Sequence, residues 1–411
     1  MKSDFELLGV AVDSDRAERY VLDLGFADEV ENFLDTGETA IGTTFENTHY
    51  IGRLEAQQAP IGRLRGQFGV WGQRRDYRAS GEEALAPPTQ QNSLAGFAYE
   101  EYEFDDVALQ FGARVERNGY DPETRPEPAG HDAHDRRFPA REGDDEHSDE
   151  PPVARDRSFT GLSGSLGVRV PFAQRRGTLV ASFSSSYRAP ALEELYNFGP
   201  HVGNLAFEIG NPALNAERSN GGELIFRWNS EALHGEISGF YYAISNFIFG
   251  AETGEIVDGL IELNYTQGDA RFVGTDASFS FHLSQAVHLE LSGSYVDAEL
   301  TDTGESLPRI PPLSGRISID WSPTNQIEVE PELFAAARQN NVYGVETATA
   351  GYVTFNLTAS YTIARAKTMH VISLRATNLT NELFRNHTSL IKDLAPEMGR
   401  RVLLTYALRL F

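Results

Sequence analysis

The 411-residue sequence contains no cysteine, only 3 methionines and no long apolar run. The absence of cysteine excludes disulfides and thiolate metal sites. No stretch approaches the roughly 18 consecutive apolar residues of a transmembrane helix, so we expect none. The opening residues, MKSDFELLGV, have no apolar core of a secretory signal peptide.

Positive charge is scarce as well, because 35 Lys and Arg stand against 60 Asp and Glu, for a net charge of −25. So acidic a chain lacks the basic surface that nucleic acids require, and we expect no nucleic-acid partner. The charge suits a cationic partner or a surface that must stay hydrated. The length exceeds one ordinary core, so it indicates two domains or one very large closed architecture.

Alternation of apolar and polar residues with period two runs from one end of the sequence to the other. In one example, Val107, Leu109, Phe111, Ala113 and Val115 fall on one face of an extended chain, and the residues between them fall on the other. This pattern predicts about 17 strands. Many of them have about ten residues or more, which is longer than the usual globular strand.

Short spacers alternate with long ones, and the long ones are 119–156, 190–218, 249–260 and 379–399. Long antiparallel strands with one apolar face, joined by short turns at one end and long loops at the other, are typical of a transmembrane antiparallel β-barrel. We therefore predict an all-β barrel whose apolar face meets outer-membrane lipid. A soluble sandwich or propeller explains the alternation but not the strand lengths. Expected interfacial aromatic residues are Tyr77, Tyr120, Tyr187, Tyr241, Tyr242 and Trp321.

The spacer 119–156 is the most distinctive segment, because it gathers histidines and carboxylates with almost no apolar residues. Imidazole and carboxylate groups suit Zn²⁺ without any thiolate. The candidate metal ligands in this loop are His131, Asp132, His134, Asp135, Asp144, Asp145, Glu146 and His147. The alternative is a hydrated loop whose composition alone keeps it unfolded. A Ca²⁺ loop is a third reading, but the D-x-D-x-D-G pattern is missing.

Three stretches resemble the barrel of TonB-dependent outer-membrane receptors. They are YRAPALEELY (187–196), IGNPALNAERSNGGEL (209–224) and ATNLTNELFRNHTS (376–389). The first resembles a strand end that leads into an extracellular loop, the second a return into the next strand, and the third a motif before the last strand. The resemblance implies active transport across the outer membrane, with energy supplied by the TonB complex through a plug domain.

A narrower resemblance is to the zinc-uptake branch of this family, carried by RNHTSLIKDLAPEMGRR (385–401), YNFGPHVGNLAFEIGNP (196–212) and ALAPPTQQNSLAGFAYEEYE (84–103). Members of that branch commonly carry a His- and Asp-rich extracellular loop, and 119–156 lies where such a loop would be. The resemblance implies Zn²⁺ as transported ligand rather than cofactor. It makes His201 the best candidate ligand outside that loop, with Glu193, Glu194 and Glu208 near it in sequence.

The predicted strand number departs from the family, whose receptors have about 22 strands around a plugged lumen. We therefore expect residues 1–411 to form the C-terminal part of such a barrel, without its plug and with about five strands lacking. Either the chain is a fragment or its assigned start lies too late.

Other histidines and carboxylates are weaker candidates. We expect His387 in a turn or loop, and His234, His282, His288 and His370 at the barrel rim or lumen rather than as ligands. Glu328, Glu330 and Glu332 form an inward acidic row that suits passage of a cation.

No G-x-S-x-G, H-E-x-x-H or P-loop motif is found, so no catalysis is expected. The alternatives that stay open are a siderophore or haem receptor of the same family, a passive porin-like barrel, and an outer-membrane enzyme.

Overall fold

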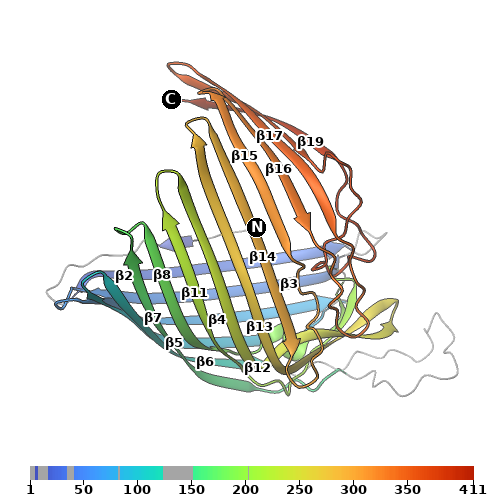
Figure 1. Cartoon of the computed structure of the whole chain (residues 1–411). Helices are drawn as coiled ribbons and strands as arrows, with labels where there is room; N and C mark the ends of the chain where they lie inside the picture. Colours follow the sequence, from blue (N-terminus) through green and yellow to red (C-terminus); the bar gives the residue numbers. More distant parts are fainter. Residues whose placement is uncertain (1–4, 8–16, 35–40, 82–83, 124–150, 202) are drawn as a thin grey trace.

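The computed structural model describes residues 5–7, 17–34, 41–81, 84–123, 151–201 and 203–411. These residues form one 19-stranded sheet and a single five-residue helix, α1 (Leu192–Tyr196), as Figure 1 shows. The predicted all-β fold is confirmed. No helix in the described part of the chain is long and apolar enough to cross a membrane.

The strands follow one another around the sheet with a single interruption. Each strand from β1 to β8 pairs antiparallel with the next, β8 then pairs with β11, and neighbours continue to pair as far as β19. The skipped strands β9 and β10 form a small hairpin. The bounds are β1 Phe5–Leu7, β2 Ala17–Leu34, β3 Ile41–Gln58, β4 Leu64–Gly81, β5 Thr89–Phe104, β6 Val107–Pro122, β7 Arg157–Phe172, β8 Gly177–Arg188, β9 Phe198–His201, β10 Ala206–Ile209, β11 Glu217–Asn229, β12 Leu233–Val257, β13 Leu260–Ser284, β14 Val287–Leu300, β15 Ser314–Thr324, β16 Ile327–Ala336, β17 Tyr352–Ala364, β18 Thr368–Thr377 and β19 Arg401–Leu410.

The strand register keeps the two faces of the sheet chemically distinct. Between β14 and β15, Leu289 lies opposite Ile319 and Leu291 opposite Ile317, while the alternate pairs join His288 to Asp320 and Glu290 to Ser318. Successive side chains of a strand point to opposite faces, so one face is apolar and the other polar. Large apolar side chains remain exposed on the first face, for example Leu224 at 54% and Ile317 at 48%. This is the pattern expected where lipid covers the apolar face.

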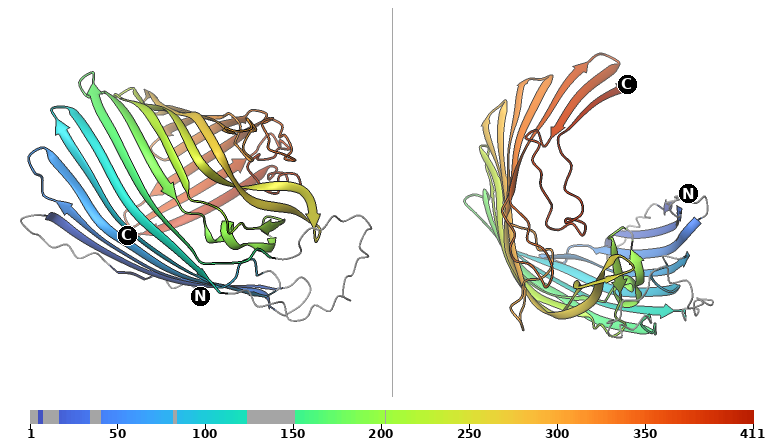
Figure 2. Two further views of the ribbon diagram at one scale, coloured as in Figure 1. Left: turned by 90° about the horizontal axis from the view of Figure 1, so that it is seen from below. Right: turned by 90° about the vertical axis from the view of Figure 1, so that its right-hand side faces the viewer.

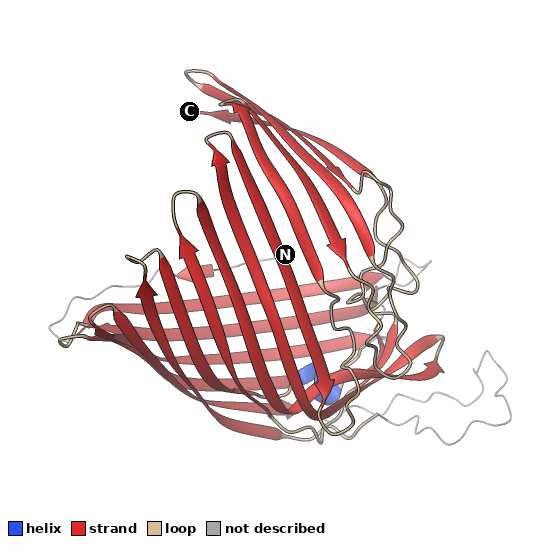
Figure 3. Cartoon of the chain, in the orientation of Figure 1, coloured by secondary structure: helices blue, strands red, loops and turns tan. Residues whose placement is uncertain are grey.

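The sheet curves into a trough, and Figure 2 shows its open side between β19 and the first strands. Short turns gather at one end of the strands and long loops at the other. Figure 3 shows α1 at the loop end. The predicted alternation of short and long connections is confirmed in this arrangement.

Two predicted loops contain regular structure. Residues 249–260 are not a loop, because β12 and β13 continue as a hairpin to an Asp258–Gly259 turn whose φ values are +49° and +81°. The spacer 190–218 holds α1, β9 and β10. These two short strands account for the excess over the predicted number.

The prediction of interfacial aromatics is partly wrong. Tyr120 is 4% exposed and belongs to a buried cluster with α1, and Tyr77 and Tyr187 pack against that cluster. These rings therefore stabilise the loop end rather than meet lipid. Tyr241 and Trp321 are 51% and 48% exposed, which fits the prediction.

Candidate functional site

The spacer between β8 and β11 folds into a compact support at the loop end of the sheet. The Glu194 carboxylate accepts a hydrogen bond from the backbone N–H of Ala191 (2.7 Å), which fixes the start of α1. Leu192 and Leu195 of α1 are 1% and 0% exposed and pack with Leu214. Burial of such side chains contributes about 1.5–3 kcal/mol each, so the spacer is held in one conformation.

The hairpin β9–β10 brings His201 and Glu208 together. Its register pairs His201 with Ala206, which lies on the same face as Glu208 two residues further on. The Nδ1 atom of His201 lies 2.7 Å from Oε1 of Glu208. Strand β10 also runs parallel to β13, so the hairpin is fixed to the wall of the sheet.

Glu208 is 2% exposed and its carboxylate is held by several donors. The side-chain amides of Asn197 and Asn204 each donate to it at 2.7 Å, and the hydroxyl of Tyr265 lies 3.4 Å away. A buried carboxylate needs such donors to remain ionised. The network therefore fixes a negative charge next to the imidazole of His201.

The charges of the pair stabilise one another. The hydrogen bond to Glu208 raises the pKa of His201 although partial burial opposes it. Burial raises the pKa of Glu208, but hydrogen bonds from His201, Asn204 and Asn197 outweigh it and leave that pKa below its usual value. With Nδ1 engaged by Glu208, Nε2 of His201 is the nitrogen left for a ligand. A histidine that donates Nδ1–H to a carboxylate is a common arrangement for metal ligands.

Glu193 and Glu194 lie near His201 in sequence but have other partners. Arg75 binds Glu193 at 3.0 Å. Arg188 bridges Glu194 (3.0 Å) and Glu217 (2.6 Å). These ion pairs join strands to α1, so of the three carboxylates near His201 in sequence only Glu208 reaches it.

Both ends of the spacer 119–156 are attached to this support. The Tyr120 hydroxyl donates to the carbonyl of Pro190 (2.6 Å), and the Tyr196 hydroxyl donates to that of Arg155 (2.8 Å). The guanidinium of Arg157 donates to the carbonyl of Leu214 (2.6 Å). The His- and Asp-rich segment therefore leaves and re-enters the sheet beside the hairpin that carries His201.

The predicted ligands of that segment lie outside the described residues. They are His131, Asp132, His134, Asp135, Asp144, Asp145, Glu146 and His147. In the part of the chain that the structure describes, no group of three or more His, Asp or Glu side chains is arranged to hold a metal ion.

His387 lies in the loop between β18 and β19, as predicted, and it is 1% exposed. Its Nδ1 lies 2.8 Å from the Thr349 hydroxyl, and Lys392 Nζ lies 2.8 Å from Glu346 Oε1. Arg309 reaches the same group through its backbone N–H, which donates to Glu346 (3.2 Å). This buried set joins the loops after β14, β16 and β18, and the lysine at its centre makes it a structural contact rather than a cation site.

Asn197, Asn204 and Tyr265 were not among the predicted site residues. Asn197 and Asn204 flank His201 within a stretch that has regular strand spacing on either side, and amides at turns are common for local reasons. Tyr265 comes from β13, which approaches only after the sheet has formed.

A family model described as the TonB dependent receptor-like β-barrel matches residues 8–381. Among solved structures, the copper transporter OprC is 18% identical over 97% of this chain and 63% of its own, with a TM-score of 0.77. The FrpB iron transporter from Neisseria meningitidis is 11% identical over 95% and 60%, with a TM-score of 0.69. The Serratia marcescens hemophore receptor HasR is 16% identical over 96% and 63%, with a TM-score of 0.64. The chain spans about three-fifths of the length of these structures.

Proposed function

Because the chain belongs to the family of TonB-dependent receptor β-barrels, we propose that it serves active uptake of a metal ion across the outer membrane, and that the ion is Zn²⁺. The observation that carries this proposal is the imidazole of His201, aligned by Glu208 and presenting Nε2 at the loop end. Imidazole and carboxylate are borderline and hard donors, which suit Zn²⁺ or Cu²⁺. The chain offers no cysteine and only 3 methionines for a softer ion such as Cu⁺.

The acidic loop and His201 have separate roles in this proposal. The loop 119–156 collects cations above the lumen through weak, flexible ligands, since ordering such a loop costs conformational entropy. His201 then provides a fixed ligand at the place where both ends of the loop are attached. Coupling to the TonB complex, through a plug domain, is part of the same proposal, as is the lipid around the apolar face.

Protons compete with the metal at His201. Only a neutral imidazole nitrogen binds Zn²⁺, and the pKa of His201 is raised by its hydrogen bond to Glu208. Zinc binding at this residue therefore weakens as the pH falls through that raised pKa. Release of a proton on binding is the calorimetric sign of this competition.

The test is zinc uptake by cells that carry the wild-type receptor, the His201→Gln variant, or a deletion of residues 124–150. We expect the deletion to reduce uptake mainly at low zinc concentration and His201→Gln to reduce it at all concentrations. His370→Gln, at the opposite end of the sheet, is the matched control. Uptake that is unchanged in both variants contradicts the proposal.

The second candidate is uptake of a siderophore or haem by the same fold, since similar structures include an iron transporter and a hemophore receptor. In that case iron accumulation responds to loss of the receptor while zinc accumulation does not. A passive pore conducts in planar bilayers without any energy source, and an outer-membrane enzyme turns over an ester or peptide in detergent, so both alternatives have their own readouts.

A further inference from the structure

Three histidines from consecutive strands meet at the short-turn end of the sheet. They are His234 on β12, His282 on β13 and His288 on β14. The ring centres of His282 and His288 are 4.4 Å apart, and those of His234 and His282 are 5.0 Å apart. His282 lies directly opposite His288 in the strand register. The strands therefore hold the three imidazoles in one row.

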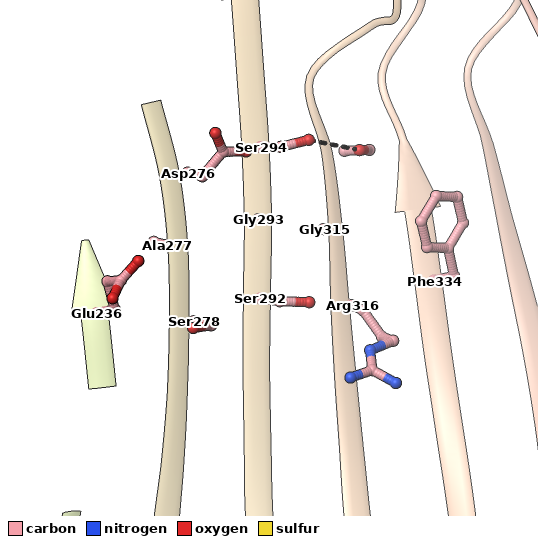
Figure 4. A pocket seen from close by; sticks show the side chains of 11 residues that line it. Glu236, Asp276, Ala277, Ser278, Ser292, Gly293, Ser294, Gly315, Arg316 and Phe334 are labelled. Carbon is pink, nitrogen blue, oxygen red and sulfur yellow. Dashed lines mark hydrogen bonds between the residues drawn. The ribbon is translucent and has the colours of Figure 1, made fainter. Parts of the chain in front are cut away.

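The row lies on the polar face. Phe281 and Leu289, which alternate with these histidines, are paired with each other on the apolar face. The polar face continues along the same strands through Glu236, Ser278 and Ser292, which Figure 4 shows lining a shallow pocket. Asp320 lies opposite His288 on β15 and extends the row by a carboxylate.

The nitrogens of this row lack hydrogen-bond partners. Nδ1 of His282 is buried and unpaired. Across the described ranges, the contacts of the three rings are with one another, not with hydrogen-bonding groups. Buried polar atoms in folded proteins are normally paired, so an unpaired imidazole nitrogen indicates a ligand that would complete it.

We propose that His282 and His288 form a binding site for a borderline divalent cation, Zn²⁺ or Cu²⁺, at the short-turn mouth of the lumen, with His234 as its third ligand. Two imidazoles on one tetrahedral zinc ion have ring centres roughly 5 Å apart, given Zn–N bonds of about 2.0–2.1 Å. The two observed separations bracket that value closely. Small rotations of the rings turn their nitrogens toward a common point without moving the strands.

The site is distinct from the loop-end site in position and in ligands. Short turns lie on the periplasmic side of outer-membrane barrels. If the proposed uptake function holds, an ion that has crossed the lumen meets this row last. That role rests on the proposed function, whereas binding to the row does not.

The experiment measures zinc stoichiometry by equilibrium dialysis of the full chain in detergent. We expect the double variant His282→Gln, His288→Gln to bind one zinc ion fewer than the wild type, and His370→Gln at the same end to bind the wild-type number. His201→Gln tests the loop-end site in the same assay, so the two proposals fail separately. A double variant that binds as much zinc as the wild type, with the same affinity, overturns the inference.

A second measurement needs no substitution and therefore no assumption about folding. Diethyl pyrocarbonate modifies free imidazole nitrogens, and the modified residues are identified by mass spectrometry. Zinc is expected to protect His282 and His288 while His370 stays reactive. Equal modification of all three with and without zinc contradicts the proposed site.

Discussion

At the scale of the residue, His201 and His387 show how the same side chain acquires opposite properties. Glu208 raises the pKa of His201 through a direct hydrogen bond. Burial, followed by the charge of Lys392, lowers the pKa of His387 although Glu346 opposes the change. His201 thus gains a proton readily and has a nitrogen open to a ligand, whereas His387 is neutral inside a packed contact.

The lowered pKa of His387 predicts a loop assembly that is sensitive to acid. Because the folded state holds this proton less tightly than the unfolded state, its contribution to stability is complete above the ordinary histidine pKa of about 6.5 and is lost as the pH falls. Limited proteolysis of loops 337–351 and 378–400 should therefore accelerate below that pH.

The control for this prediction is His387→Asn, which has no titrating group and should show a flatter pH profile. The same acceleration in wild type and variant would mean that other groups open the loops.

At the scale of the element, the stretch IGNPALN explains why a glycine stands between β10 and the return strand β11. A Cβ on Gly210 would lie 2.7 Å from the backbone nitrogens of Asn197 and Tyr196, a distance that real Cβ atoms do not reach. The backbone N–H of Gly210 also donates to the carbonyl of Asn197 (2.6 Å). Close backbone approach is therefore what positions β10, and with it Glu208, against α1.

We predict that Gly210→Ala displaces β10 and weakens the zinc affinity that depends on His201. Overpacking of this kind costs about 1–3 kcal/mol. Gly96→Ala is the matched control, because a Cβ at Gly96 meets nothing within 4 Å. Zinc titration and proteolysis of the spacer 190–218 measure the effect, and equal behaviour of the two variants would argue against close packing at Gly210.

At the scale of the whole molecule, the sheet is organised by its two faces. The exposed apolar side chains lie on one face along its whole width, and rows of charged and hydroxyl side chains lie on the other. A sheet with this division is stable only where lipid covers the first face and water fills the second. The trough in Figure 2 is therefore the wall of a membrane barrel.

The two faces predict opposite tolerance to charge. Leu224→Arg in the middle of β11 places a cation in lipid and should cost about 2–4 kcal/mol, with less protein in the outer membrane. Glu223→Arg places the same side chain on the polar face one residue away and should be tolerated. Heat-modifiable migration in gels and membrane fractionation measure both variants, and equal loss in both would contradict the assignment of faces.

The sequence by itself determined the strands, their two faces and the alternation of short turns with long loops, because period-two alternation and spacer length are local properties of the chain. It also predicted His201, but it associated that residue with Glu193 and Glu194 as much as with Glu208. It treated the row of His234, His282 and His288 as unrelated rim residues. Only the tertiary structure selected Glu208 and brought the three rings together, because strand register and the docking of β10 on β13 depend on pairing between distant segments.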